Sequence, residues 1–304
     1  MVAQRIKRKP HARLNSFSAG TELVFHIILG LFAAACIIPF IFVIIISFTS
    51  EESIRAIGYS FIPQSWSLQA YDYVFAMGDA LWRSYYNSFL ITVIGTVLSV
   101  IICVLYSYPL FRKDFQFRSF FNYFSFITMI FGGGLVPWYI LMRNLGLLNS
   151  IWALVLPLSV PVSSMAILMN FMRSLPQEIE EAAAIDGAGN FRILWSIMLP
   201  VLTPSLATVG LFSFVYHWND WFQGALFMNN PNRYPLQTYL QTLLTNFRDL
   251  LRQSGSDYYS LLQRMNEQTG RASQLFLGLV PILVVYPFVQ KYFTTGLVMG
   301  SVKG

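Results

Sequence analysis

Residues 173–200 read RSLPQEIEEAAAIDGAGNFRILWSIMLP, and the first half of this stretch carries the start and stop signals of a short helix. Ser174 is placed to cap the N-terminus, and Gln177 three residues later completes a capping box. Pro176 falls in the first turn, where proline is tolerated and where acidic side chains are favoured by the helix dipole. Gly187 suits the position just past the C-terminus, because glycine adopts the left-handed conformation without strain. The pattern predicts a mostly polar helix of about three turns.

The composition around this stretch is that of a membrane protein. The chain has 304 residues, 55% of them hydrophobic and 11% charged, against roughly 25% charged in soluble domains, and its mean hydropathy is +0.54. The net charge is +6. The basic residues are scattered among apolar runs, so this charge does not indicate a nucleic-acid-binding protein. Cys36 and Cys103 both lie in apolar runs, which excludes a disulfide-rich secreted domain and gives no sign of a metal site.

Six apolar runs are long enough to cross a bilayer, which takes about 20 apolar residues per helix. They cover about residues 23–48, 86–111, 120–142, 151–172, 199–227 and 273–293. Glycines and prolines inside them are tolerated, because neighbouring helices and water satisfy the freed backbone groups. The sequence therefore predicts an all-α integral membrane protein with six transmembrane helices.

Basic residues in the short loops predict the orientation. The N-terminal tail, residues 1–22, contains five of them, and Arg112, Lys113 and Arg118 follow the second run. Both segments are expected in the cytoplasm, so both termini should be cytoplasmic. The loop 173–198 is then cytoplasmic and the long loop 228–272 lies outside, within one transmembrane domain that spans residues 23–304.

A second pattern extends over the same loop. This loop resembles, position for position, the EAA motif of bacterial ABC importer permeases. The matching residues are Glu181-Ala182-Ala183, then Gly187, then Ile197 and Leu199-Pro200. Other segments are similar to the carbohydrate-uptake permeases of the MalG type. These are Asn87-Ser88, Leu145-Gly146-Leu147, Asn149, Leu175-Pro176, Trp218-Asn219, and Gly296-Leu297 with Gly300 to Gly304. The long insertion after the fifth run and residues 55–59 look like the LplC/YtcP-like branch, which handles complex or oligomeric glycans.

The resemblance implies the type I ABC importer permease fold in a bacterial cell membrane. In that family the EAA loop is a coupling helix that docks on a cytoplasmic ATPase. The resemblance therefore assigns a coupling role to the loop 173–198. The coupling residues it implies are Glu178, Glu181, Ala182, Ala183, Asp186 and Gly187, with Glu181 making the polar contact. Ala182 and Ala183 would form an exposed face small enough for close approach by another protein.

The resemblance also implies the partners. The chain contains no Gly-Lys dipeptide, so it has no phosphate-binding loop. ATP and Mg²⁺ are then expected on a separate ATPase, and this chain is expected to be neither an enzyme nor a cofactor-binding subunit. A homologous second permease, two ATPase subunits, an extracytoplasmic solute-binding protein and membrane lipid complete the expected assembly, which imports a carbohydrate such as an oligosaccharide or complex glycan.

The fifth run contains the candidate pathway residues. Asp220 is a carboxylate inside an apolar run, where it costs about 2.5 to 3.5 kcal/mol at the bilayer centre unless it faces a partner or water. At helical spacing His217, Asp220, Trp221 and Gly224 share one face, and an aromatic ring next to hydrogen-bonding groups suits a sugar surface. The candidate pathway residues are His217, Asn219, Asp220 and Trp221. The alternative is that Asp220 lies near the outer end of the span, is satisfied by the backbone or by His217, and contacts no solute.

Glycines 132–134 leave two readings open. They either form a broken helix that lines the pathway or allow a close helix crossing.

The outer loop contains a helical stripe of leucines and phenylalanine, at Leu236, Leu240, Leu243, Phe247 and Leu250. By position it resembles the segment through which MalG-type subunits contact the binding protein, and Arg248 and Arg252 are the candidate docking residues. The alternative is a helix that lies on the membrane surface.

The competing function is a self-sufficient secondary transporter. That class is expected to show internal repeats and several intramembrane charges near the midplane. An intramembrane enzyme would need paired catalytic residues, and no such motif is present.

Overall fold

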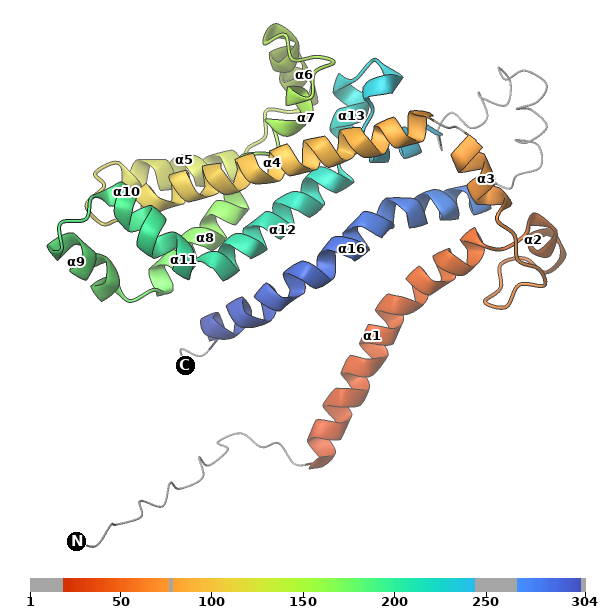
Figure 1. Cartoon of the computed structure of the whole chain (residues 1–304), viewed down its shortest axis with the longest axis horizontal. Coiled ribbons are helices and arrows are strands. Elements are labelled where there is room, and N and C mark those ends of the chain that lie inside the picture. The colour runs from red at the N-terminus through yellow and green to blue at the C-terminus, as the bar shows by residue number, and fades with distance from the viewer. Residues whose placement is uncertain (1–18, 77–78, 244–266, 302–304) are drawn as a thin grey trace, which may run out of the picture.

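The structure is a computed structural model that describes residues 19–76, 79–243 and 267–301. The regular elements in these residues are helices (Figure 1). The β pairing found in this part of the chain is an isolated antiparallel bridge between Thr49 and Trp66. The expectation of an all-α protein is therefore confirmed.

Two helices coincide with the first two apolar runs. They are α1 (Ala19–Ser47) and α4 (Asp79–Phe111), and both are long and apolar enough to cross a membrane. Helix α4 packs against α8 (Val162–Ser174) and α12 (Thr203–Asn219), while α1 packs on α16 (Glu267–Ser301), which contains the sixth run. Figure 1 shows α4, α12 and α16 running side by side, with the N-terminal half of α1 diverging from them.

The third run is not one helix. It consists of α5 (Arg118–Ile130) and α6 (Leu135–Asn144), whose axes differ by 114°. Gly134 has a φ of +83°, a conformation that favours glycine. A Cβ built at any of glycines 132–134 meets nothing of this chain within 4 Å. The glycines thus break the helix and do not serve a close crossing within the chain.

The fourth and fifth runs are also interrupted. The fourth consists of α7 (Trp152–Val155) and α8, with residues 156–161 non-helical between them. The fifth begins with α11 (Leu199–Val201). This short helix continues α10 (Asn190–Arg192) and η1 (Ile193–Met198), and together they meet α12 at 82°. Prolines lie at both breaks, at 157 and 161 in the fourth run and at 200 and 204 in the fifth, and each removes a backbone donor.

Length and apolar composition give two spans in the described residues, or four if each bent pair counts as one. The count of six stays a prediction.

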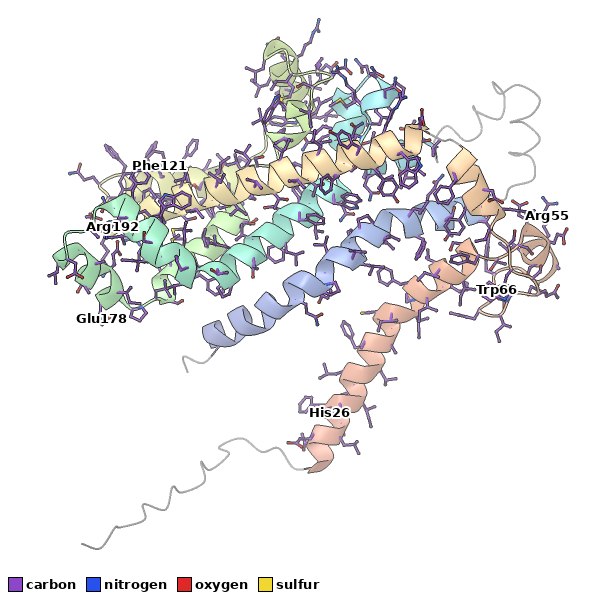
Figure 2. The ribbon with its side chains drawn as sticks, viewed as in Figure 1. His26, Arg55, Trp66, Phe121, Glu178 and Arg192 are labelled. Carbon is purple, nitrogen blue, oxygen red and sulfur yellow. The ribbon has the colours of Figure 1, made fainter. Side chains whose placement is uncertain are left out.

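Loops from the two predicted sides of the membrane lie at opposite ends of the bundle. Helix α9 (Gln177–Ile185) lies at one end, here called the coupling end, together with α10 and the C-terminus of α4 (Figure 1). Helices α2 (Glu51–Ile57) and α3 (Gln69–Ala76) lie at the far end. Figure 2 shows Glu178 and Arg192 at the coupling end and Trp66 at the far end. This separation agrees with the predicted topology, although it does not identify the side of the membrane.

Small buried residues let the central helices approach closely. One face of α4 is a stripe of them: Ser84, Ser88, Thr92, Gly95, Ser99, Cys103 and Ser107. A Cβ at Gly95 would lie 2.2 Å from Nε2 of His217 on α12, so the glycine is required for this contact. The α4–α12 interface is thus built on close approach, as is common between transmembrane helices.

Candidate coupling site and pathway

Helix α9 is the predicted short helix of residues 173–200, but it begins later than expected. Its first residue is Gln177 and its N-cap is Pro176, with no side-chain cap hydrogen bond. The prediction that Ser174 caps it is wrong, because Ser174 is the last residue of α8 and its hydroxyl donates to the Phe171 carbonyl at 2.7 Å. Leu175 precedes a proline and is extended, with ψ of 145°. A helix therefore cannot run from Ser174 into α9.

The C-terminus of α9 is as predicted. Gly187 has a φ of +78° and follows the C-cap Asp186. Its N–H donates to the Ala184 carbonyl, and the Ala188 N–H donates to the Ala183 carbonyl, both at 3.0 Å. This is the Schellman arrangement, in which a left-handed residue ends the helix and satisfies its last carbonyls. A Cβ at Gly187 would meet nothing within 4 Å, so the glycine is required by backbone conformation and not by space.

The two alanines of the motif lie on different faces. Ala183 is buried and belongs to the core cluster of the coupling end, which also contains Met172 and Leu194. Ala182 is exposed. The prediction of a shared exposed alanine face is therefore corrected, because Ala183 packs on this chain's own core.

The solvent face of α9 has helical spacing. Its members are Glu178, Glu181, Ala182 and Ile185, all exposed and related by steps of three or four residues. The Ile185 side chain is 86% exposed, and Asp186 is exposed at the end of the same helix. A face with two carboxylates, a small residue and a fully exposed isoleucine suits a partner surface better than bulk water.

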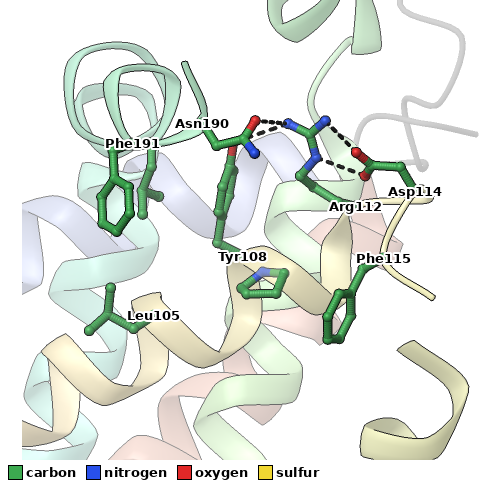
Figure 3. Close-up of a pocket in the computed structure, with 9 residues that line it drawn as sticks. Leu105, Tyr108, Arg112, Asp114, Phe115, Asn190 and Phe191 are labelled. Carbon is green, nitrogen blue, oxygen red and sulfur yellow. Dashed lines mark hydrogen bonds and ion pairs between the residues drawn. The ribbon is translucent and has the colours of Figure 1, made fainter. Parts of the chain in front are cut away.

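The opposite side of α9 is held to α4 through Arg112, which sequence reasoning did not assign to the site. Its guanidinium lies 2.9 Å from a carboxylate oxygen of Glu180 on α9 and donates at 2.9 Å to the side-chain oxygen of Asn190 on α10. It also pairs with Asp114 at 2.8 Å. Figure 3 shows the guanidinium between Asp114 and Asn190. One arginine thus connects the end of α4 to two elements of the coupling loop.

The charges at Arg112 stabilise one another. The hydrogen bond to Asp114 is the main cause that raises the pKa of Arg112, and Glu180 contributes in the same direction. The hydrogen bond from Arg112 lowers the pKa of Asp114. Arg112 and Glu180 are only 23% and 19% exposed, whereas Asp114 is 65% exposed. The pair with Glu180 is therefore the better shielded of the two.

Two cavities flank this arginine. One of about 330 Å³ is bounded by α4 and α10 and lined by Leu105, Tyr108, Pro109, Arg112, Asp114, Phe115, Asn190, Phe191 and Leu194 (Figure 3). The other, of about 270 Å³, lies between the end of α4 and α9 and is lined by Phe111, Arg112, Lys113, Asp114, Glu180, Glu181 and Ala184. Glu181, the predicted polar contact, borders the second of them.

The candidate pathway residues are not gathered on one helix face. Helix α12 ends at Asn219 and Asp220 is extended, with ψ of 106°, so the expected face of His217, Asp220 and Trp221 does not form. Asp220 accepts a hydrogen bond from the Gln223 N–H at 3.2 Å. This is the backbone-satisfied arrangement that the sequence left open as the alternative for Asp220.

His217 is buried and faces α4. Its Nδ1 lies 2.8 Å from the Ser213 carbonyl, and its ring packs on Gly95. Asn219 and Trp221, by contrast, line a separate cavity of about 150 Å³ with residues of 236–243 and α16.

The described part of the leucine stripe, within residues 236–243, is buried within the chain. Residues 236–243 are helical, and Leu236, Leu240 and Leu243 pack with Leu81 of α4 and Trp218 of α12. These leucines are therefore not available to a binding protein or a membrane surface. Phe247, Leu250, Arg248 and Arg252 lie outside the described residues, so the docking prediction for the two arginines is untested.

Several residues of the wider resemblance hold the far end together. Asn87 donates to the carbonyls of Asn232 and Tyr234 at 3.1 and 3.2 Å, and Ser88 accepts from the Leu236 N–H at 2.7 Å. Asn149 has a φ of 58° and its N–H donates to the Phe227 carbonyl at 3.0 Å. These polar residues therefore fix the start of the outer loop, which the sequence pattern alone did not show.

The comparisons with known proteins agree with this architecture. No protein-family model matches the chain. The polygalacturonan/rhamnogalacturonan transport system permease protein YtcP of Bacillus subtilis (strain 168) is 35% identical over 93% of this chain and 98% of its own length. Protein LplC of the same organism is 36% identical over 91% and 92%. The chain belongs to the sugar ABC transporter permeases.

More distant relatives extend the same picture. The arabinooligosaccharides transport system permease protein AraQ of Halalkalibacterium halodurans is 29% identical over 90% of this chain and 93% of its own length. Among solved structures, a chain of a bacterial ABC transporter involved in the import of the acidic polysaccharide alginate matches with a TM-score of 0.78. That match has 28% identity and covers 92% of this permease and 99% of the solved chain. The resemblance to the LplC/YtcP-like branch is therefore confirmed, and the protein is an ABC importer permease subunit.

Proposed function

We propose that this chain is one of two homologous permease subunits of an ATP-driven importer in a bacterial cell membrane. Together they form the pathway for an oligosaccharide or complex glycan. The relatives named for polygalacturonan, rhamnogalacturonan and arabinooligosaccharide transport support this substrate class. The chain would cross the membrane six times with both termini in the cytoplasm, and it would receive solute from an extracytoplasmic binding protein at the far end.

In this proposal α9 is the coupling helix, and a separate ATPase binds the ATP and Mg²⁺. The observation that carries the proposal is the division of α9 into two faces. Glu180 and Ala183 hold one face to the chain, while Glu181, Ala182 and Ile185 are presented outward. A partner that moves the outward face would move α4 as well, because Arg112 joins the two helices, and rigid-body movement of packed helices is a common way to transmit such a change.

Purification of the intact assembly tests the subunit composition. The chain is extracted from its native membrane in mild detergent, and bound proteins are identified by mass spectrometry. We expect a second permease, an ATPase and a binding protein. Recovery of this chain alone, competent for transport in liposomes, would overturn the proposal in favour of a secondary transporter.

A crosslink tests the docking face. Ala182→Cys, with exposed Cys36 replaced by serine, should form a crosslink to lysine side chains of the ATPase with a short reagent that carries a maleimide and an amine-reactive ester, while Trp66→Cys at the far end should not. Cys103 is buried and needs no replacement. An equal yield of ATPase crosslink from both positions would refute the assignment of α9.

A further inference from the structure

The loop between α2 and α3, residues 58–68, presents an apolar surface at the far end of the protein. It contains no charged residue. Its exposed large apolar side chains are Tyr59, Phe61, Ile62, Trp66 and Leu68, and Ile62 is 83% exposed. Contiguous apolar surface is unfavourable in water, so it marks a contact with another protein or with a membrane.

Backbone hydrogen bonds fix this loop against the end of α1. They flank the antiparallel bridge at that end. The Ser50 N–H donates to the Ser65 carbonyl at 3.1 Å, and the Ser67 N–H donates to the Phe48 carbonyl at 2.8 Å. The loop and the end of α1 therefore form one unit, and the exposed side chains are presented by a fixed backbone.

The loop turns back along α1 and does not extend beyond it. Figure 1 shows it beside the C-terminal end of α1. The ring of Phe61 in the loop lies 4.6 Å, between centroids, from the ring of Phe42 in α1. Phe42 precedes Ser47, the last residue of α1, by five residues, which corresponds to about 7.5 Å along the helix axis. Phe61 therefore lies at a level about 7.5 Å inside the end of α1.

The length of α1 places this contact at the boundary of the membrane. The apolar part of the helix, Gly20–Ser47, has 28 residues and is about 42 Å long, against about 30 Å for the hydrocarbon core of a bilayer. When α1 is centred in the bilayer, each end extends about 6 Å beyond the core. Phe42 and Phe61 then lie where hydrocarbon meets headgroups, the level at which aromatic side chains are enriched.

The charged side chains of the same region lie on α2. Arg55 pairs with Glu51 at 3.4 Å, and Glu52 is exposed. Figure 2 shows Arg55 at the outermost edge of the far end and Trp66 nearer to α1. The loop thus continues the exposed apolar surface of α1, whereas α2 faces outward. A soluble partner that approaches from the water would meet the charges of α2 first.

We propose that residues 58–68 anchor the far end in the membrane interface, with Phe61 and Ile62 among the lipid chains and Trp66 at the level of the headgroups. Lipid stabilises these side chains because it removes their apolar area from water. The anchor holds the end of α1 at one depth. It requires only that α1 crosses the membrane, so it goes beyond the proposed importer function and does not depend on it.

A depth measurement with spin labels tests the anchor. Ile62→Cys and, as the matched control, Glu52→Cys are made with Cys36 replaced by serine; Cys103 is buried and should not react. The full-length protein, purified with its bound subunits, is labelled with a nitroxide and reconstituted in liposomes of phosphatidylethanolamine and phosphatidylglycerol. Collisions with oxygen, which concentrates in lipid, and with a nickel chelate, which stays in water, report the depth. We expect the label at 62 to lie about 5–10 Å below the lipid phosphates and the label at 52 to lie above them.

The same collision rates can refute the anchor. Equal access of the nickel chelate to positions 62 and 52 would show that the loop faces water. A label at 62 that neither reagent reaches would show that a protein subunit covers the loop. Addition of the solute-binding protein should leave both collision rates at 62 unchanged, and protection of that label by the binding protein would make the loop a docking surface instead. Replacement of Ile62 should not disturb the fold, because its side chain is almost fully exposed.

Discussion

The pair between Arg112 and Glu180 should determine how much transport each ATP yields. Replacing Glu180 by Gln keeps the shape of the side chain and removes its charge, and replacing Arg112 by Met removes the donor. Their 2.9 Å contact joins side chains that are each less than a quarter exposed. The free-energy cost of disrupting such a contact lies between two limits. An exposed salt bridge contributes about 0–1 kcal/mol, and disruption of a buried pair costs about 3–5 kcal/mol.

A cost of about 2 kcal/mol is therefore expected, and it changes an equilibrium constant by roughly 30-fold. The equilibrium concerned is between α9 held against α4 and α9 released from it. Because α9 would still present its outward face, the ATPase should still bind. We expect uptake per ATP hydrolysed to fall about tenfold or more for both variants. The double variant should be little worse than Arg112→Met alone, since the arginine variant already removes the contact with Glu180.

The assay measures uptake and ATP hydrolysis together in liposomes that contain the whole complex. Arg192→Met is the matched control, because Arg192 is exposed at the coupling end and forms no ion pair among the described residues. It removes one positive charge without touching α9, so it should retain wild-type coupling. The reasoning is refuted if Glu180→Gln retains wild-type uptake per ATP, or if Arg192→Met loses as much.

Three further outcomes are expected from glycine positions. Gly187→Trp should insert and assemble normally but abolish uptake, whereas Gly187→Asn, which tolerates a positive φ, should retain most of it; equal loss in both would contradict the role of backbone conformation. Gly95→Ala should lower the melting temperature of the detergent-solubilised complex, because its Cβ meets His217, and adding His217→Ala should recover part of the loss. Gly224→Ala should likewise destabilise the far end, because its Cβ would lie 2.0 Å from Oγ1 of Thr238, and Thr238→Ala should relieve it.

The sequence predicted the elements whose signals are local. The first two apolar runs, the polar helix and its terminal Gly187 depend on residues close together in the chain, and α1, α4 and α9 confirm them. The start of α9 was missed because two signals competed. Serine is a favoured N-cap residue, which pointed to Ser174. Pro176, however, forces Leu175 out of the helical region, so α9 starts after the proline.

Contacts between distant segments were not predictable in the same way. Arg112 and Glu180 are separated by 68 residues, and neither position has a periodicity that points to the other. In the sequence Arg112 counted only as one of several basic residues that set the orientation. Its pairing depends on how α4, α9 and α10 are packed, which no single segment encodes.

In the fifth apolar run, a charged residue in the sequence was a poor guide to which polar groups lack a partner. Asp220 stood out because a carboxylate is costly in an apolar run, yet a backbone N–H satisfies it where α12 ends. The buried polar atoms that lack a hydrogen-bond partner in the described residues include Oγ of Ser213, a neutral hydroxyl one turn before His217, and Nε2 of His217 itself. A serine gives no signal in a hydropathy profile, because in most helices it bonds to its own backbone, as Ser205 does. Hydropathy and charge therefore point to Asp220, whose carboxylate accepts a hydrogen bond, and not to the neutral polar group at Ser213, which lacks a partner in the described residues.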